Sequence, residues 1–253
     1  MQYTDIGIDL GTASILVYIR GKGVVLKEPS VVAFDRDTQK IKAIGEDARL
    51  MLGRTPGNIV AVRPLRQGVI SDYKVTEQMM KHFIQKALGR KTFRKPIIAV
   101  CVPSGVTEVE KKAFFDLVIH STAKAKEVNI VERSIADAIG LNLDVQNTKG
   151  VFIVNFGGET TELSVIAGGG MVMNRLLKIG GVTFDQSIIN LVRHSHDFLI
   201  GRHTAEVLRK SFGIFTSEIE SMLTAAGRDL ITGVPMRKGI SINLVRLAMK
   251  DPL

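Results

Sequence analysis

Two stretches of the chain, 146 residues apart, repeat one pattern of side chains. Residues 6–17 and 151–165 each contain an apolar run, a short turn with glycine and threonine, and a second apolar run. This pattern predicts two tight β-hairpins. Glycine permits a positive φ and lets bare N–H groups approach an anion, and threonine hydroxyls add donors. An acidic residue at the strand end can hold Mg²⁺ through water. One hairpin opening each half of the chain predicts paired lobes that grip the phosphates of a nucleotide.

The length of 253 residues is enough for two compact lobes with cores of their own. Short apolar runs alternate with amphipathic segments, which indicates an α/β fold. The pattern predicts strands at 5–10, 14–20, 30–34, 97–102, 151–156, 161–167 and 171–178. It predicts helices at 74–88, 106–121, 133–145, 182–194, 204–211 and 216–225.

The composition narrows the class of protein. A net charge of +9 indicates either a general solubility charge or an anionic partner surface. Nucleic acid is the weakest such partner, because aromatic residues are only 6%, tryptophan is missing and no DNA-binding motif is present. No apolar run approaches the length of a membrane span, and no signal peptide is expected. The single cysteine, Cys101, lies in an apolar run, so we expect a core thiol in a reducing cytoplasm.

The hairpins and their flanking sequences resemble the actin-like ATPase superfamily, and within it the bacterial actins of the MreB/Mbl type. The matching stretches are 5–13, 27–33, 51–61, 63–65, 68–70, 105–107, 200–201, 204–206 and 227–230. The resemblance covers essentially the whole chain and implies an actin-like ATPase fold of two lobes built on duplicated β-hairpin and helix units. The implied lobes are 1–148 and 149–253, with a membrane- and polymer-contact subdomain inserted near 32–95.

The first hairpin matches the family's first phosphate-binding hairpin. The matching residues are Asp9, Gly11, Thr12, Ala13 and Ser14. Ser14 stands where the family has Asn, and it keeps a donor for the phosphate. The resemblance implies that Asp9 holds Mg²⁺ weakly, through water. The alternative interpretation is a plain hairpin with an exposed aspartate.

The second hairpin departs from the family pattern of an Asp, an aliphatic residue, three glycines and two threonines. The implied nucleotide-binding positions are Asn155, Gly157, Gly158, Glu159, Thr160 and Thr161. Asn155 replaces the Asp and carries no charge for hydrated Mg²⁺. Glu159 replaces the third glycine and is expected to place a carboxylate near the phosphates. Repulsion of ~1 to ~4 kcal/mol at about 4 Å weakens binding roughly tenfold to a thousandfold.

The family's hydrolytic base is also replaced. Residues 131–140 align with a segment that contains Glu-Glu-Pro, in which the second Glu orients the attacking water. Here that position is Arg133, followed by Ser134 in place of Pro. An arginine cannot accept a proton from water. The preceding Glu132 is retained and is expected to point elsewhere. Arg133 could instead hold a phosphate, which would give a protein that binds ATP without hydrolysing it.

The expected ribose and adenine contacts are only partly present. Glu206 matches the family's acidic residue, and Arg209 stands in for its lysine. Gly181 is followed by Val182, where the family places an Asp. The chain stops at 244–253, in what resembles the opening of a longer helix. We therefore expect a C-terminally truncated, incomplete second lobe that exposes apolar sheet edges and faces.

A basic loop aligns with the apolar loop by which such filaments touch the inner membrane. Its membrane-binding candidates are Arg90, Lys91, Phe93, Arg94 and Lys95. Each cation contributes ~1 kcal/mol near an anionic lipid surface, and Phe93 adds a shallow anchor. The alternative is a solvated turn. His194 and His196 suggest a metal pair, but no third ligand is near in sequence, so no metal is expected there.

The resemblance implies a cell-shape-determining cytoskeletal protein that forms or joins membrane-associated filaments guiding cell-wall synthesis. The implied cofactor is ATP with Mg²⁺, with weakened binding here, and ATPase activity is expected to be lost. The implied partners are itself or related bacterial actins, the cell-wall elongation machinery and the inner membrane surface. The implied location is the cytoplasm at the inner face of the cell membrane. Two alternatives stay open: an active ATPase or phosphotransferase of the superfamily, and a non-functional truncated paralogue.

Overall fold

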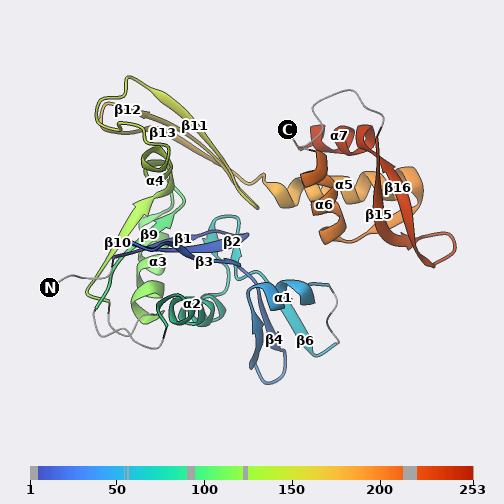
Figure 1. The fold of residues 1–253 in the computed structure, drawn as a ribbon, viewed down its shortest axis with the longest axis horizontal. Helices are drawn as coiled ribbons and strands as arrows, with labels where there is room; N and C mark the ends of the chain where they lie inside the picture. Colours follow the sequence, from blue (N-terminus) through green and yellow to red (C-terminus); the bar gives the residue numbers. More distant parts are fainter. Residues whose placement is uncertain are drawn as a thin grey trace. The chain divides into compact units, whose positions relative to one another are not determined.

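The structure is a computed structural model that describes residues 5–53, 55, 57–89, 95–121, 125–212 and 221–252. The chain divides into two compact units, Met1–Lys178 and Ile179–Leu253. Each unit combines sheets and helices, which confirms the α/β class (Figure 1). The lobe boundary expected after residue 148 stays a prediction. None of the helices in the described ranges could span a membrane.

A five-stranded sheet forms the centre of the first unit, in the order β10-β9-β1-β2-β3. Its strands are β1 (Asp5–Leu10), β2 (Ser14–Ile19), β3 (Gly23–Pro29), β9 (Ile97–Val102) and β10 (Glu127–Glu132). Strand β1 pairs in parallel with β9 and antiparallel with β2. The side chains of Ile8, Ile15 and Val100 alternate into one core, as expected for strands with one buried face. Because β1 and β9 are parallel neighbours, their C-terminal ends lie side by side.

Two helices, α2 (Tyr73–Leu88) and α3 (Glu108–Ser121), pack on this sheet in the same core (Figure 1). The side chain of Asp72 caps α2 by accepting a hydrogen bond from the Val75 N–H at 3.0 Å. The helix ends at Leu88, and Gly89 caps it with a φ of +68°, which suits glycine. Phe83 and Phe114 from the two helices are both 1% exposed, so they anchor this core.

Smaller elements complete the part of this unit before β9. A three-stranded sheet has the order β5-β4-β6, and α1 packs against it. Their bounds are β4 (Val32–Asp35), β5 (Ile41–Ile44), α1 (Glu46–Met51) and β6 (Ile59–Val62). A two-stranded hairpin follows, formed by β7 (Leu65–Arg66) and β8 (Val69–Ile70). The turn of this hairpin is Gln67-Gly68, and Gly68 lies at the candidate site.

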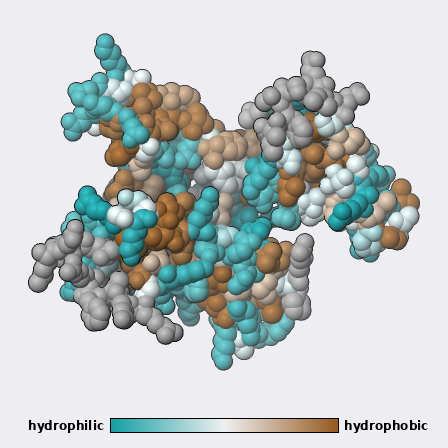
Figure 2. Space-filling model, in the orientation of Figure 1, coloured by the Kyte–Doolittle hydropathy of each residue, from teal (hydrophilic) through white to brown (hydrophobic). Residues whose placement is uncertain are grey.

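The second predicted hairpin forms a separate antiparallel sheet, β11 (Val151–Phe156), β12 (Thr161–Ala167) and β13 (Gly170–Leu177). Its buried face packs on α4 (Arg133–Gly140) through Ile153 and Ile166. The opposite face is apolar and exposed over these strands (Figure 2), with exposed Phe152, Val154, Phe156 and Met173. The expectation of an exposed apolar sheet face is therefore confirmed.

The second unit contains a three-stranded antiparallel sheet in the order β14-β15-β16, covered by helices. Its elements are α5 (Gly181–His196), β14 (Phe198–Ile200), α6 (Arg202–Phe212), β15 (Met222–Asp229), β16 (Pro235–Ser241) and α7 (Ile242–Lys250). Phe198 and Ile240 are fully buried in its core. Gly227 is required here, since a Cβ would lie 2.5 Å from the Leu199 carbonyl oxygen.

Two predicted helices differ from the structure. The helix predicted at 216–225 is wrong over 222–225, because Met222 begins β15, which pairs along its length with β16. Residues 216–220 lie outside the described part. The helix predicted at 133–145 ends at Gly140, and Asn142 follows with a φ of +57°. Pairing with β16 makes 222–225 a strand, and the left-handed backbone at Asn142 ends the helical conformation. Neither can be read from the local sequence pattern.

Candidate functional site

The two predicted hairpins form the same turn. In the first, the Gly11 N–H donates to the Ser14 carbonyl oxygen at 3.1 Å, and in the second the Gly157 N–H donates to the Thr160 carbonyl oxygen at 2.8 Å. The two turns keep the 146-residue offset of the sequence pattern. The predicted duplication of the hairpin is thus confirmed.

Glycine is needed in these turns for close approach. A Cβ on Gly157 would lie 2.8 Å from the Thr160 carbonyl oxygen. A Cβ on Gly158 would lie 2.7 Å from the Cβ of Ala13, in the other hairpin. Neither Gly157 nor Gly158 has the positive φ that glycine permits, so close approach is the reason for glycine at these two positions. The turns of the two hairpins therefore touch each other where Gly158 meets Ala13.

A pocket of about 120 Å³ lies where the turns meet. The described residues that line it are Asp9, Leu10, Gly11, Thr12, Ala13, Ser14, Gly68, Pro103, Arg133, Asn155, Gly157, Gly158 and Thr160. Most of the nucleotide-binding residues predicted in the two hairpins are thus brought together. Thr161 is buried at the start of β12 and, like Glu159, is not among these lining residues. The lining includes the hydroxyl residues Thr12, Ser14 and Thr160, a residue type that can donate to an oxyanion.

An ion pair between Asp9 and Arg133 lies in the pocket. Asp9 is next to last in β1, and Arg133 is the first residue of α4. The Arg133 Nη2 donates to Asp9 Oδ1 at 3.1 Å, and the Arg133 side chain is only 12% exposed. Burial works to lower the pKa of Arg133, but the nearby Asp9, Cys101 and Glu162 raise it on balance. The guanidinium therefore keeps its charge inside the pocket.

Asn155, at the equivalent position of the second hairpin, is bound to an acid on α4. Its Nδ2 donates to Asp137 Oδ2 at 2.7 Å. Burial raises the pKa of the Asp137 carboxyl, partly offset by this hydrogen bond and by Arg133. The amide of Asn155 is thus directed to α4, which was not predicted from the sequence.

The Glu159 carboxylate is held at the edge of the pocket. Its Oε2 accepts a hydrogen bond from the Gln67 backbone N–H at 2.8 Å, in the turn between β7 and β8. The next residue in that turn, Gly68, lines the pocket. The weakening of phosphate binding expected from Glu159 stays a prediction.

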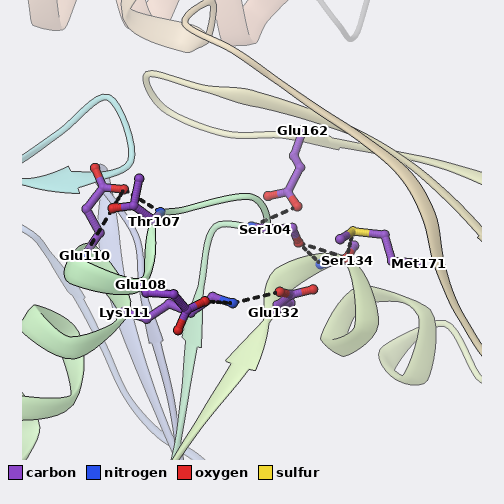
Figure 3. Close-up of polar contacts among 9 residues, drawn as sticks. All are labelled: Ser104, Thr107, Glu108, Glu110, Lys111, Glu132, Ser134, Glu162 and Met171. Atoms are coloured by element: carbon purple, nitrogen blue, oxygen red, sulfur yellow. Dashed lines mark hydrogen bonds and ion pairs between the residues drawn. The ribbon is translucent and has the colours of Figure 1, made fainter.

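Glu132 and Arg133 face different partners although they are adjacent. The Glu132 carboxylate lies 3.3 Å from Lys111 Nζ on α3 (Figure 3). Lys111 also pairs with Glu108 at 3.1 Å. Arg133, in contrast, lines the pocket. These contacts agree with the prediction that Glu132 points elsewhere, and they leave the guanidinium as the group presented at that position.

A buried polar cluster includes Ser134, the residue after Arg133 in α4 (Figure 3). The Ser134 N–H donates to Ser104 Oγ at 3.1 Å, and the Ser134 hydroxyl donates to Met171 Sδ at 3.1 Å. The Ser104 N–H donates to Glu162 Oε1 at 3.2 Å, and Asn174 Nδ2 donates to the same oxygen at 2.9 Å. Glu162 is 3% exposed. The cluster thus joins α4, β12, β13 and the loop after β9, and sequence reasoning missed it.

Glu162→Ala is expected to lower the free energy of unfolding by about 2 kcal/mol. The substitution leaves the buried Ser104 N–H without its acceptor and removes one acceptor from Asn174. Glu162→Gln keeps an oxygen at this position, so its cost is expected to be below about 1 kcal/mol. Urea denaturation followed by circular dichroism measures both changes. Equal effects of the two substitutions would contradict this role of the carboxylate oxygen.

Cys101, on β9, is expected to be unreactive in the folded protein. Burial raises the pKa of its thiol to about 12. At pH 8 only about one thiol in ten thousand is then ionised, and the thiolate is the reactive form. Iodoacetamide should label the native protein at least about 100-fold more slowly than the urea-unfolded chain. Mass spectrometry of timed samples measures this ratio, and equal rates would contradict a protected, half-buried Cys101.

The remaining predicted site residues lie elsewhere. In the second unit, Glu206 pairs with Lys210 at 2.7 Å, and Arg209 Nε donates to Asp185 Oδ1 at 2.6 Å. Their role at a nucleotide stays a prediction. Of the membrane-binding candidates, Lys95 is exposed, whereas Arg90, Lys91, Phe93 and Arg94 lie outside the described residues. The described residues contain no group of three His, Cys, Asp or Glu side chains that could hold a metal ion.

Comparisons with known proteins agree on one family. The family model described as MreB/Mbl protein matches residues 3–253. The cell shape-determining protein Mbl of Bacillus subtilis is 41% identical over 248 residues, covering 98% of this chain and 74% of Mbl. The cell shape-determining protein MreB of Escherichia coli K12 is 42% identical over 259 residues, covering 100% of this chain and 74% of MreB.

The solved structures show the same fold. MreB5 of Spiroplasma citri bound to AMPPNP superposes with a TM-score of 0.91 at 32% identity, covering 100% of this chain and 75% of that one. MreB5 has also been solved bound to ADP, with the same TM-score. The MamK double helical filament matches with a TM-score of 0.79 at 19% identity, covering 99% of this chain and 76% of that one. These matches confirm the actin-like fold.

Proposed function

The chain belongs to the MreB/Mbl family, and we propose that it is a cell-shape cytoskeletal subunit that binds an adenine nucleotide without hydrolysing it. Curated relatives more than 40% identical are named cell shape-determining proteins. MreB5, which shares the fold, is bound to AMPPNP in one structure and to ADP in another. These findings support both the class of protein and the class of ligand.

One observation carries the nucleotide part of the proposal: the two equivalent hairpin turns meet at a single pocket. Gly11 and Gly157 make the same backbone hydrogen bond, and Gly158 of one turn lies against Ala13 of the other. The pocket gathers turn residues with donors, among them Thr12 and Thr160. Phosphate oxygens are ligands that hydroxyl and backbone N–H donors suit.

The described residues that line the pocket offer no unpaired base for hydrolysis. Arg133 has five donors and no acceptor, so it cannot take a proton from water or orient one through a lone pair. Glu132 is engaged by Lys111 on α3. Asp9 lines the pocket, but its carboxylate is paired with Arg133. A bound ATP would therefore persist, and turnover of the subunit would not be set by its own hydrolysis.

The wider cellular role extends the proposal through the family resemblance. We expect self-association into filaments, alone or with related bacterial actins, on the inner face of the cell membrane beside the cell-wall elongation machinery. The basic segment 90–95, with four cations around Phe93, supports contact with anionic lipid. The alternatives are an active ATPase or phosphotransferase, and a non-functional paralogue.

The first test is calorimetric titration of the purified protein with AMPPNP, combined with a phosphate-release assay in ATP. We expect saturable one-to-one binding of AMPPNP and no release above the level of buffer. Protein-dependent release would contradict the loss of hydrolysis and favour the ATPase. No binding at millimolar AMPPNP would contradict the nucleotide part of the proposal.

A matched variant makes the release assay sharper. Arg133→Glu puts a carboxylate at the position where the family resemblance implies the hydrolytic base. If Arg133 is the reason that hydrolysis is lost, this variant should release more phosphate than the unaltered protein at saturating ATP, although its affinity for AMPPNP should fall because a cation beside Asp9 is replaced by an anion. Glu132→Gln serves as the control, because Glu132 pairs with Lys111 and should leave release unchanged.

A further inference from the structure

We propose that Arg133 is the resident cation for the phosphates in this pocket, so that the nucleotide binds equally well with and without a divalent metal ion. This inference rests on the proposed function, because it concerns how the same pocket neutralises its ligand. It assigns Arg133 a direct binding role, whereas the proposed function needs only that Arg133 is not a base.

The pocket does not fit a hydrated Mg²⁺ ion. Mg²⁺ prefers oxygen ligands and is usually held by one or two carboxylates together with the phosphates. Among the described residues that line the pocket, Asp9 is the one carboxylate. Its Oδ1 accepts a hydrogen bond from the Arg133 guanidinium at 3.1 Å. A divalent cation beside this oxygen would therefore have to displace, or be repelled by, a fixed positive charge.

The second hairpin adds no charge that could compensate. Asn155 is neutral and uses its amide to hold Asp137 at 2.7 Å. Burial raises the pKa of Asp137, and this carboxyl is directed to the amide. The two hairpins thus offer a metal ion one carboxylate, Asp9, which is paired with Arg133, and one amide, Asn155.

Arg133 has the properties of a phosphate ligand. Its side chain is largely buried and lines the pocket beside both turns. A guanidinium stays charged at all physiological pH values and presents several N–H donors in a planar fork. It can therefore pair with Asp9 and still donate to a phosphate oxygen, and such charge-assisted hydrogen bonds are among the strongest in proteins. Because it also pairs with Asp9, it offsets the negative charge of that carboxylate in the pocket.

The test is titration with ADP in 5 mM EDTA and, separately, in about 5 mM MgCl₂, at constant ionic strength. We expect the two dissociation constants of the unaltered protein to agree within about threefold. In EDTA, Arg133→Gln should lose about 10- to 100-fold in affinity, because a charged hydrogen-bonding partner is removed. Arg133→Lys keeps the charge without the fork, and its loss should be smaller.

Arg20→Gln is the matched control. Arg20 pairs with Asp5 at the other end of β1, at 2.6 Å, so this variant also removes a guanidinium from an Arg–Asp pair on that strand. It lies outside the pocket lining and should bind ADP like the unaltered protein in both buffers. Thermal unfolding of all variants shows that each is folded before it is titrated.

The outcomes separate the two proposals. Affinity that falls tenfold or more when Mg²⁺ is removed would overturn the inference and leave the proposed function standing. Equal affinity of Arg133→Gln and the unaltered protein in EDTA would do the same. No binding of ADP in either buffer would overturn the proposed function, and the inference with it. Manganese supplies an independent readout: in electron paramagnetic resonance titrations, we expect Mn²⁺ alone to show no site on the protein.

Discussion

Gly158→Val is expected to abolish detectable nucleotide binding and to lower the free energy of unfolding by about 1–3 kcal/mol. A Cβ at this position would lie 2.7 Å from Ala13 Cβ and 3.5 Å from the Ala13 backbone nitrogen. The added isopropyl group must therefore push the two turns apart. When the turns separate, their donors can no longer bind the same phosphate group. The loss in free energy of binding should therefore exceed the loss in free energy of unfolding. Calorimetry with AMPPNP and urea denaturation measure the two effects.

Gly170→Val is the control for this prediction. Gly170 begins β13 in the same sheet, and a Cβ there has no atom within 4 Å. The substitution should leave nucleotide affinity within about twofold of the unaltered protein. Binding by Gly158→Val that matches Gly170→Val would contradict the account of two touching turns.

Asp185→Ala is expected to lower the stability of the second unit by about 3 kcal/mol. Asp185 on α5 accepts a hydrogen bond from Arg209 on α6 at 2.6 Å, and the two side chains are only 11% and 20% exposed. Truncating the acid leaves the guanidinium largely buried without this partner. Proteolysis at increasing urea concentration, with fragments identified by mass spectrometry, reports the unfolding of this unit.

Two variants sharpen the interpretation of Asp185. Glu206→Ala breaks an exposed pair with Lys210 on the same helix and should cost less than about 1 kcal/mol. Asp185→Ala combined with Arg209→Met removes both charges and should be less destabilising than Asp185→Ala alone. If the double variant were the less stable of the two, the cost would arise from lost packing and not from an unpaired charge.

Local pattern was enough to predict the two hairpins. The apolar alternation around Asp9 and Asn155 predicts the strands, and the glycines between them predict the turns. These features depend on neighbours in the sequence.

The directions of the polar side chains could not be predicted in the same way. The partner of Glu159, the Gln67 N–H, comes from a turn 92 residues away in the sequence. Asn155 binds Asp137 from α4, and Glu162 binds the Ser104 N–H. Each of these contacts depends on tertiary structure. The strand at 222–225, predicted as helix, likewise depends on its pairing with β16.

The most direct test of the central claim, that a nucleotide places its phosphates on the two hairpin turns, is an NMR titration of ¹⁵N-glycine-labelled protein with ADP. The account predicts that the amide signals of Gly11, Gly157 and Gly158 shift with saturation, because their turns line the pocket. The signals of Gly140 and Gly170, outside the pocket lining, should stay in place. Saturable binding that leaves the three turn glycines unmoved and shifts other glycines instead would contradict the account.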